Sequence, residues 1–257
     1  MAWTNFPYSD DAYRYTAASL KKAWARLHAG DAEPFPKSAA LVEAWIAFHA
    51  GDFEQAAKLG LAEGMAGYSV ANKATCIYAN YLEKSEKKKL TLFQEVAERC
   101  EEQQAKDPKN AAAFYWHAYA LGRYAQGISI VKALSQGIGN KVKASLDTTL
   151  KLAPKHADAH IALGAYHAEI IDKVGAMIGG LTYGAKKDEG LKLYKAALKL
   201  NPASAIAHVE YANGLVMLEG KKKMDEAVKL YEEAAACEPA DAMERLDVEL
   251  ARAELDD

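Results

Sequence analysis

Cysteine and excess charge are both scarce in this sequence, and each scarcity excludes a class of protein. The 257 residues hold three cysteines, Cys76, Cys100 and Cys237, which form neither a CxxC pair nor a disulfide framework. This usage favours a reducing compartment. The formal net charge is only −3, with lysines interleaved among acidic residues, so the broad basic surface of a nucleic-acid-binding protein is missing. We therefore expect no nucleic-acid partner.

Long apolar runs are also missing. No stretch approaches the roughly 20 apolar residues that cross a bilayer, and the opening MAWTNFPYSDD is neither a basic leader nor an apolar signal. We therefore expect no membrane span and a cytoplasmic location. Apolar residues make up 51% of the chain and charged residues 26%, which is typical of a folded protein with a substantial core.

Proline is present only 7 times, yet four prolines close similar phrases. These phrases are KDPKNAAAF around Pro108, LAPKHADAH around Pro154, LNPASAIAH around Pro202 and CEPADAMER around Pro239. The stretches before the last two also match each other, DEGLKLYKAALKLNP against DEAVKLYEEAAACEP. Since proline ends a helix, a recurring helix-proline phrase predicts a stack of similar helical units.

The spacing of Ala227, Tyr231, Ala234 and Pro239 resembles the second helix of a tetratricopeptide repeat. Small residues at such positions let two antiparallel helices approach closely, while the large residue fills the space opposite. The resemblance implies an all-α fold. We expect an α-solenoid of antiparallel helix pairs, wound as a right-handed superhelix, with capping helices at both ends.

Two insertions, around residues 126–140 and 170–187, lie between paired helices. They make these repeats longer than the about 34 residues of a regular tetratricopeptide repeat. With these insertions, the chain resembles two related groups from about residue 111 onward: the regulator-of-microtubule-dynamics family and the T component of bacterial TRAP transporters. The segments that carry the similarity are YWHAYALGRYAQG, HIALGAYHAEI and GGLTYGAKKDEGLKLYKAAL. The T components are typically secreted lipoproteins, and this sequence departs from them at its start.

We expect one helical-repeat domain over residues 1–257. It comprises an N-terminal helix and linker (1–36), degenerate repeats (37–108), three tetratricopeptide-like repeats of which two carry the long insertions (109–239), and a capping helix (240–257). Apolar side chains of the insertions are expected to be buried, with a membrane-surface role as the alternative. These side chains are Ile128, Ile130, Val131, Val174, Met177, Ile178 and Leu181.

Catalytic and metal-binding patterns are weak. No Ser/His/Asp, Cys/His or paired-carboxylate set has catalytic spacing, so we expect no enzyme and no cofactor. His156, His160 and His167 have spacing that could suit a metal, but no carboxylate or cysteine completes a ligand set. His160 also shares its repeat position with His208, which favours packing. In GGLTYGAKK, Ala185 separates glycine from lysine, unlike in a phosphate-binding loop.

The concave groove of the predicted solenoid is the best candidate for a binding surface. In tetratricopeptide proteins, defined positions of each first helix line this groove. The corresponding positions lack the cluster of cations that binds the C-terminal carboxylate of a chaperone. They supply apolar contacts and two polar groups, namely Tyr115, Tyr119, Ile161 and Val209, with Arg123 and Asn213.

Several functions fit this groove. The first hypothesis is a non-enzymatic scaffold or adaptor that binds an unknown protein or peptide. The alternative, implied by the transport-related resemblance, is a binding protein for a hydrophobic or amphipathic small molecule whose acidic head would face Arg123. A third is an oligomer that associates through the insertions. The aromatic residues Tyr115 and Tyr119 could equally fill a tight core.

Overall fold

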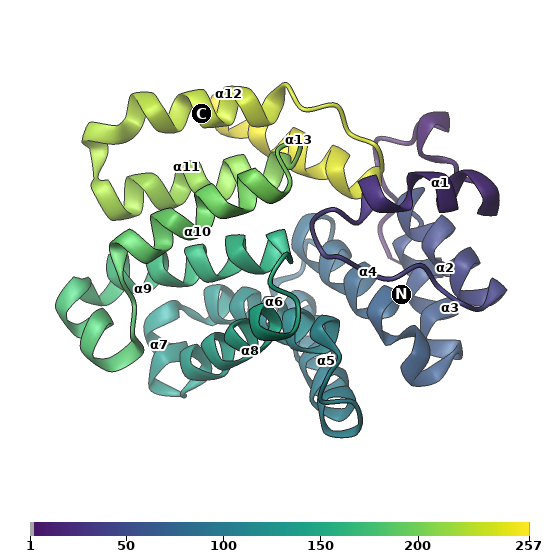
Figure 1. Ribbon diagram of the computed structural model, residues 1–257, viewed down its shortest axis with the longest axis horizontal. Coiled ribbons are helices and arrows are strands. Elements are labelled where there is room, and N and C mark those ends of the chain that lie inside the picture. The colour runs from purple at the N-terminus through teal and green to yellow at the C-terminus, as the bar shows by residue number, and fades with distance from the viewer. Residues whose placement is uncertain (1–2, 257) are drawn as a thin grey trace.

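The fold is a stack of paired helices (Figure 1). The computed structural model describes residues 3–256, and this range contains no strand. The first five helices are α1 (Ala17–Leu27), α2 (Ala39–His49), α3 (Phe53–Ala62), α4 (Tyr68–Tyr81) and α5 (Glu86–Lys106). The others are α6 (Ala111–Ile128), α7 (Ile130–Ser135), α8 (Ile138–Leu152), α9 (Ala157–Tyr183), α10 (Lys187–Leu200), α11 (Ala205–Glu219), α12 (Met224–Ala235) and α13 (Ala242–Asp256). The expected all-α repeat fold is confirmed.

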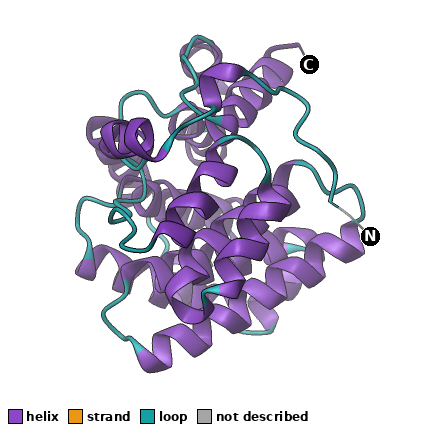
Figure 2. Cartoon of the chain, turned by 90° about the vertical axis from the view of Figure 1, so that its right-hand side faces the viewer, coloured by secondary structure: helices purple, strands orange, loops and turns teal. Residues whose placement is uncertain are grey.

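The helix pairs follow the chain. The helices α6 and α8, α9 and α10, and α11 and α12 pack against each other, and α9 also packs against α11. Figure 2, turned by 90°, shows loops joining helices throughout. The short helix α7 lies within the first insertion, between the members of the α6 and α8 pair.

The repeated proline phrase works as a helix-start signal. Two residues after each of the four prolines stands a side chain that caps the next helix: Asn110, His156, Ser204 and Asp241. Each accepts a hydrogen bond from the backbone N–H three residues later, at 3.3, 3.2, 3.3 and 2.8 Å. Such a bond satisfies an N–H that the first helical turn leaves free. Proline therefore ends one helix, and the cap begins the next.

Close packing within the repeats centres on Tyr194, whose side chain is fully buried. Two glycines make room for its ring. A Cβ atom at Gly164 would lie 3.0 Å from the ring of Tyr194, and one at Gly214 would lie 2.4 Å from it. The ring also stacks on Tyr211, with 5.4 Å between centroids. This is the small-against-large packing that the repeat pattern predicts.

The helix α13 returns from the last helix pair to the first helices. The guanidinium of Arg26 in α1 binds the carboxylate of Glu244 through two contacts, at 2.5 and 2.9 Å. The Nδ1 atom of His49 in α2 lies 2.6 Å from Oδ2 of Asp241, and both side chains are buried. The sequence predicts a cap for an open solenoid, whereas α13 joins the two ends of the stack.

The expected burial of the insertions is wrong for four apolar side chains. Val131, Met177, Ile178 and Leu181 are 60, 75, 51 and 85% exposed. For the three of these on α9, the physical reason is a kink at Gly175, whose φ of 82° is a left-handed conformation that breaks the helical direction of α9. The end of α9 therefore projects from the stack instead of packing on it (Figure 1).

Candidate functional site

A cavity opens between α6 and α9 and is also bounded by α4, α7, α8, α11 and α13. The volume of this cavity that is open to the centre of a water molecule is about 140 Å³. One part of its lining is apolar. This part comes from α7, α8 and the middle of α9, which contribute Ile130, Ala133, Leu134, Ile138, Val142, Leu146, Tyr166 and Ile170.

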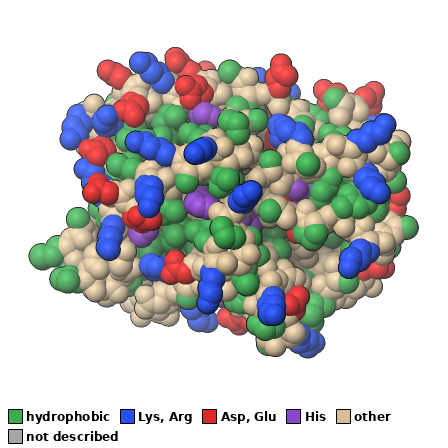
Figure 3. All heavy atoms as spheres, in the orientation of Figure 1, with side chains coloured by type: hydrophobic (Ala, Val, Ile, Leu, Met, Phe, Trp, Pro, Cys, Tyr) green, Lys and Arg blue, Asp and Glu red, His purple; other side chains and the backbone are tan. Residues whose placement is uncertain are grey.

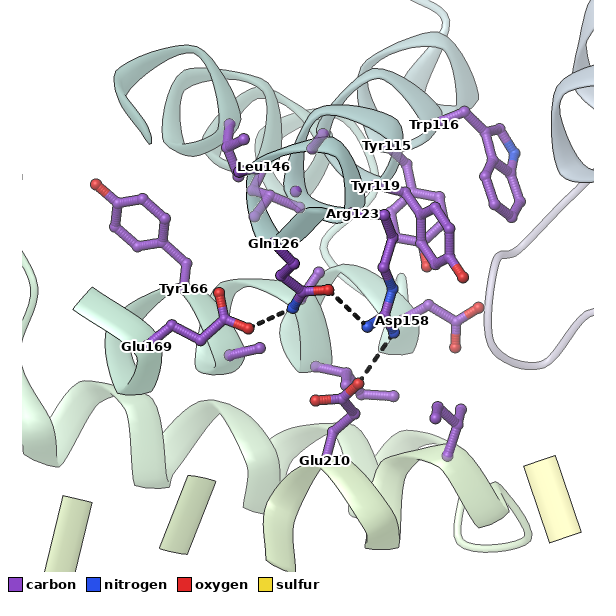
Figure 4. A pocket seen from close by; sticks show the side chains of 18 of the residues that line it. Tyr115, Trp116, Tyr119, Arg123, Gln126, Leu146, Asp158, Tyr166, Glu169 and Glu210 are labelled. Carbon is purple, nitrogen blue, oxygen red and sulfur yellow. Dashed lines mark hydrogen bonds and ion pairs between the residues drawn. The ribbon is translucent and has the colours of Figure 1, made fainter. Parts of the chain in front are cut away.

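Polar side chains also line the cavity, and Arg123 lies among them (Figure 4). Spacing of four residues puts Tyr115, Tyr119 and Arg123 on one face of α6. The guanidinium of Arg123 lies over the ring of Tyr119, 5.4 Å from its centroid. It donates hydrogen bonds to Glu210 at 3.1 Å and to Gln126 at 3.0 Å. The charge of Arg123 therefore already has a carboxylate partner.

The Arg123 side chain keeps its positive charge despite its burial. Burial opposes it, but the neighbouring Tyr119 hydroxyl and Glu210 carboxylate outweigh burial and raise the pKa of Arg123. The same arginine has the opposite effect on Tyr119, although burial dominates there and raises the pKa of the Tyr119 hydroxyl. We expect Arg123 to remain cationic and Tyr119 neutral at physiological pH.

Carboxyl groups outnumber cations in the lining of the cavity. Burial raises the pKa of Asp158 to about 7, and the nearby Asp31 carboxylate adds to the rise. Burial also raises the pKa of Glu169, although the amide of Gln126 donates a hydrogen bond to it. At the side of α13, burial raises the pKa of Asp247 well above its usual range.

The second cation in the lining, Lys73, is also neutralised. Its ammonium lies 2.6 Å from Oδ2 of Asp31, and its side chain is 2% exposed. With Arg123 bound by Glu210, neither cation is left free for a ligand. This balance argues against the acidic head group suggested by the sequence, because it would find no free cation and would be repelled by Asp158 and Glu169 where these are ionised.

Four of the six groove residues predicted from the sequence line the cavity together: Tyr115, Tyr119, Arg123 and Ile161. The other two lie elsewhere. Val209 is 1% exposed and belongs to a core cluster with Val248. Asn213 accepts a hydrogen bond from the hydroxyl of Tyr231, on the neighbouring helix α12.

Sequence reasoning missed several lining residues. Glu210 directly follows Val209, so a shift of one helical position would have found it. Asp247 and its partner Tyr81 are 166 residues apart and meet only because α13 returns to α4. No local pattern in the sequence signals that contact.

The histidines with metal-like spacing have structural hydrogen bonds. His156 caps α9, His160 Nδ1 lies 3.0 Å from the carbonyl oxygen of His156, and His167 accepts from the backbone N–H of Lys186 at 3.1 Å. Within residues 3–256, no group of three or more His, Cys, Asp or Glu is placed to hold a metal ion. In the same range no helix is long and apolar enough to cross a membrane.

Stability should depend on pH through Asp158. Its folded pKa of about 7 lies above its ordinary value of 3.8, so ionising it disfavours the fold. This penalty is absent below pH 4, grows as pH rises and is complete above pH 7. As pH rises from 5 to 8, the free energy of unfolding of Asp158→Asn should increase relative to that of the wild type, by at most about 1.4 kcal/mol per pH unit. Urea unfolding at several pH values measures this, and a pH-independent difference would contradict it.

The paired helices, the proline-and-cap starts and the glycine-lined tyrosine define a tetratricopeptide-like helical-repeat protein. The fold is similar to that in the crystal structure of a thermophilic TPR protein from Thermus thermophilus, with a TM-score of 0.57 and 17% identity. That match covers 83% of this chain and 97% of the other. Residues 69–255 match the family described as regulator of microtubule dynamics protein 1-3, and the chain belongs to this family. Comparison with the curated proteins gives no match.

Proposed function

We propose that this chain is a non-enzymatic binding protein whose cavity between α6 and α9 takes a compact amphipathic ligand. One observation carries the proposal: apolar side chains of α7 and α8 and several carboxyl groups line the same cavity. Ligand sites are usually concave, mostly apolar and supplied with a few polar groups that fix orientation. The cytoplasmic location expected from the sequence remains a prediction.

The charges of the lining support a particular kind of ligand. Its apolar body would lie against α7 and α8, and its head would lie near Glu169. Because Arg123 and Lys73 already have carboxylate partners, the head should be cationic or donate hydrogen bonds. A primary amine meets both requirements.

A scaffold that binds a protein or peptide is the second candidate. The tetratricopeptide-like fold favours it, since such solenoids present extended concave surfaces. Against a long extended peptide stands α13, which contributes Met243 and Asp247 to the wall of the cavity. A partner would therefore enter with a single side chain or chain end rather than run the length of the groove.

A matched pair of probes tests the ligand proposal. We expect octylamine to bind at least about tenfold more tightly than octanoate at pH 8, a difference of about 1.4 kcal/mol. Isothermal titration calorimetry measures both affinities. Glu169→Gln should weaken amine binding by a similar factor, because it removes the carboxylate and keeps the shape. Glu238→Gln, at an exposed position away from the cavity, is the control.

Different results would reject the cationic head group and the cavity as a binding site. Tighter binding of octanoate would reject the cationic head. If neither probe binds, and native mass spectrometry of protein purified from its source finds no small adduct, the cavity proposal fails. The scaffold candidate then stands, and capture of partners by the wild type and by Arg123→Glu would test it.

A further inference from the structure

A projecting apolar surface lies outside the cavity. It consists of Val131 on α7 and of Met177, Ile178 and Leu181 on α9 beyond the Gly175 kink, and is called the tip below. None of these four side chains lines the cavity. The helix α7, which carries Val131, packs against α9. Figure 3 shows apolar spheres on the part that projects at the left, where Figure 1 has the end of α9.

Glycine residues fix the backbone of α9 so that the tip is exposed. Gly175 at φ 82° turns the helix, and Gly184 at φ 67° ends it, both in conformations that favour glycine. Between them the buried Gly179 packs close to Ile170, since a Cβ atom there would lie 3.2 Å from that side chain. The base of the tip is therefore fixed, while its large side chains face outward. Exposed apolar side chains gathered on one surface mark an interaction site.

The two insertions that carry the tip are rich in lysine. Segments 129–143 and 170–187 contain six lysines and a single acidic residue, in a chain of net charge −3. Ion pairs occupy four of these lysines: Lys141, Lys143, Lys173 and Lys187. Lys132 and Lys186 are exposed, and neither has an acidic partner among the residues that the structure describes. The insertions that carry the tip thus combine exposed apolar side chains with two lysines whose charge is not neutralised by an acidic partner in the described range.

We propose that the tip docks this protein on a bilayer surface that carries anionic headgroups. A convex apolar projection suits insertion between headgroups, whereas the concave surfaces of the fold suit a ligand or peptide. Met177 and Leu181, four residues apart on one helical face, enter the boundary of the acyl chains. Lys132 and Lys186 remain at headgroup level, where each basic residue favours an anionic surface. No helix within residues 3–256 spans the bilayer in this arrangement.

Vesicle sedimentation tests the docking. The full chain should pellet with vesicles of phosphatidylcholine and phosphatidylserine, and less with phosphatidylcholine alone. The double variant Met177→Glu/Leu181→Glu should lower the partition coefficient by at least about tenfold, because it removes the inserted side chains and adds repelling charge. The control Leu61→Glu/Met224→Glu makes the same change in charge at two apolar positions that are each 42% exposed. It should bind like the wild type within about twofold.

Three outcomes would overturn the proposal. The first is a wild type that stays in the supernatant with both kinds of vesicle. The second is equal binding by the tip variant and the control. The third is a wild type that dimerises in sedimentation velocity while the tip variant stays monomeric, which would assign the tip to contact between copies.

A fluorescence measurement gives an independent readout of depth. Lipids with brominated acyl chains quench an indole only when it enters the bilayer. Three of the four native tryptophans, Trp24, Trp45 and Trp116, are buried in the protein. Leu181→Trp should therefore add a quenched component to the emission. Met224→Trp should add an unquenched one, and quenching of both alike would contradict insertion at the tip.

Discussion

Replacing Lys73 by methionine is expected to lower the free energy of unfolding by about 3 to 5 kcal/mol, because it leaves a buried carboxylate without its cation. The Lys73 ammonium lies 2.6 Å from Asp31 and over the ring of Phe48, 5.1 Å from its centroid. Burial disfavours the ionised form of Asp31, but His28 and Lys73 hold the pKa of this carboxyl well below its usual range. Denaturation by urea measures the loss.

The double variant Asp31→Asn/Lys73→Met is the control for this prediction. With both charges removed, no buried ion is left unpaired, so most of the lost stability should return. Additive losses would instead show that packing of the lysine stem, and not its charge, stabilises the fold. Since the folded pKa of Asp31 is depressed, its contribution is present above its ordinary pKa of 3.8 and is lost as pH falls below it.

Replacing Tyr194 by alanine should cost about 3 to 5 kcal/mol, the usual range for removing a buried aromatic ring. The surroundings cannot collapse into the space, because Gly164 and Gly214 offer no side chains to fill it. The stacked contact with Tyr211 is lost as well. The midpoint and slope of a denaturation curve give the change in stability.

Tyr194→Phe is the matched variant for the second prediction. It keeps the ring between the two glycines, so it should change stability by less than about 1 kcal/mol. A large loss in this variant would mean that the hydroxyl, and not the ring, makes the important contact. That result would contradict a stabilising role for the fit of the ring between Gly164 and Gly214.

The parts of the fold that the sequence predicts are those built from local contacts. The proline and the residue that caps the next helix lie within a few residues of each other. Pro154 and His156 therefore predict the start of α9 without any tertiary information. The face of α6 that carries Tyr119 and Arg123 follows from helical spacing alone. These local rules account for the repeat fold and for four of the six proposed groove residues.

The remainder depends on contacts between distant segments. The place of Val209 in a core with Val248, and of Asp247 beside Tyr81, follows from the return of α13. The exposure of Met177 depends on the direction that the chain takes after Gly175, and a hydrophobic pattern does not encode that direction. Apolar residues in an insertion suggest burial by composition, although their position on a projection exposes them.

The contact between α1 and α13 has a consequence for how the protein folds. In an open repeat array each unit touches only its neighbours, so the ends fray and unfolding spreads inward. Here the Arg26–Glu244 pair joins residues 218 apart in the chain, and neither end is free. Closing so long a loop raises the contact order, which slows folding, and it ties early and late helices into one cooperative transition. Amide hydrogens of α1 and α13 should then exchange at similar rates.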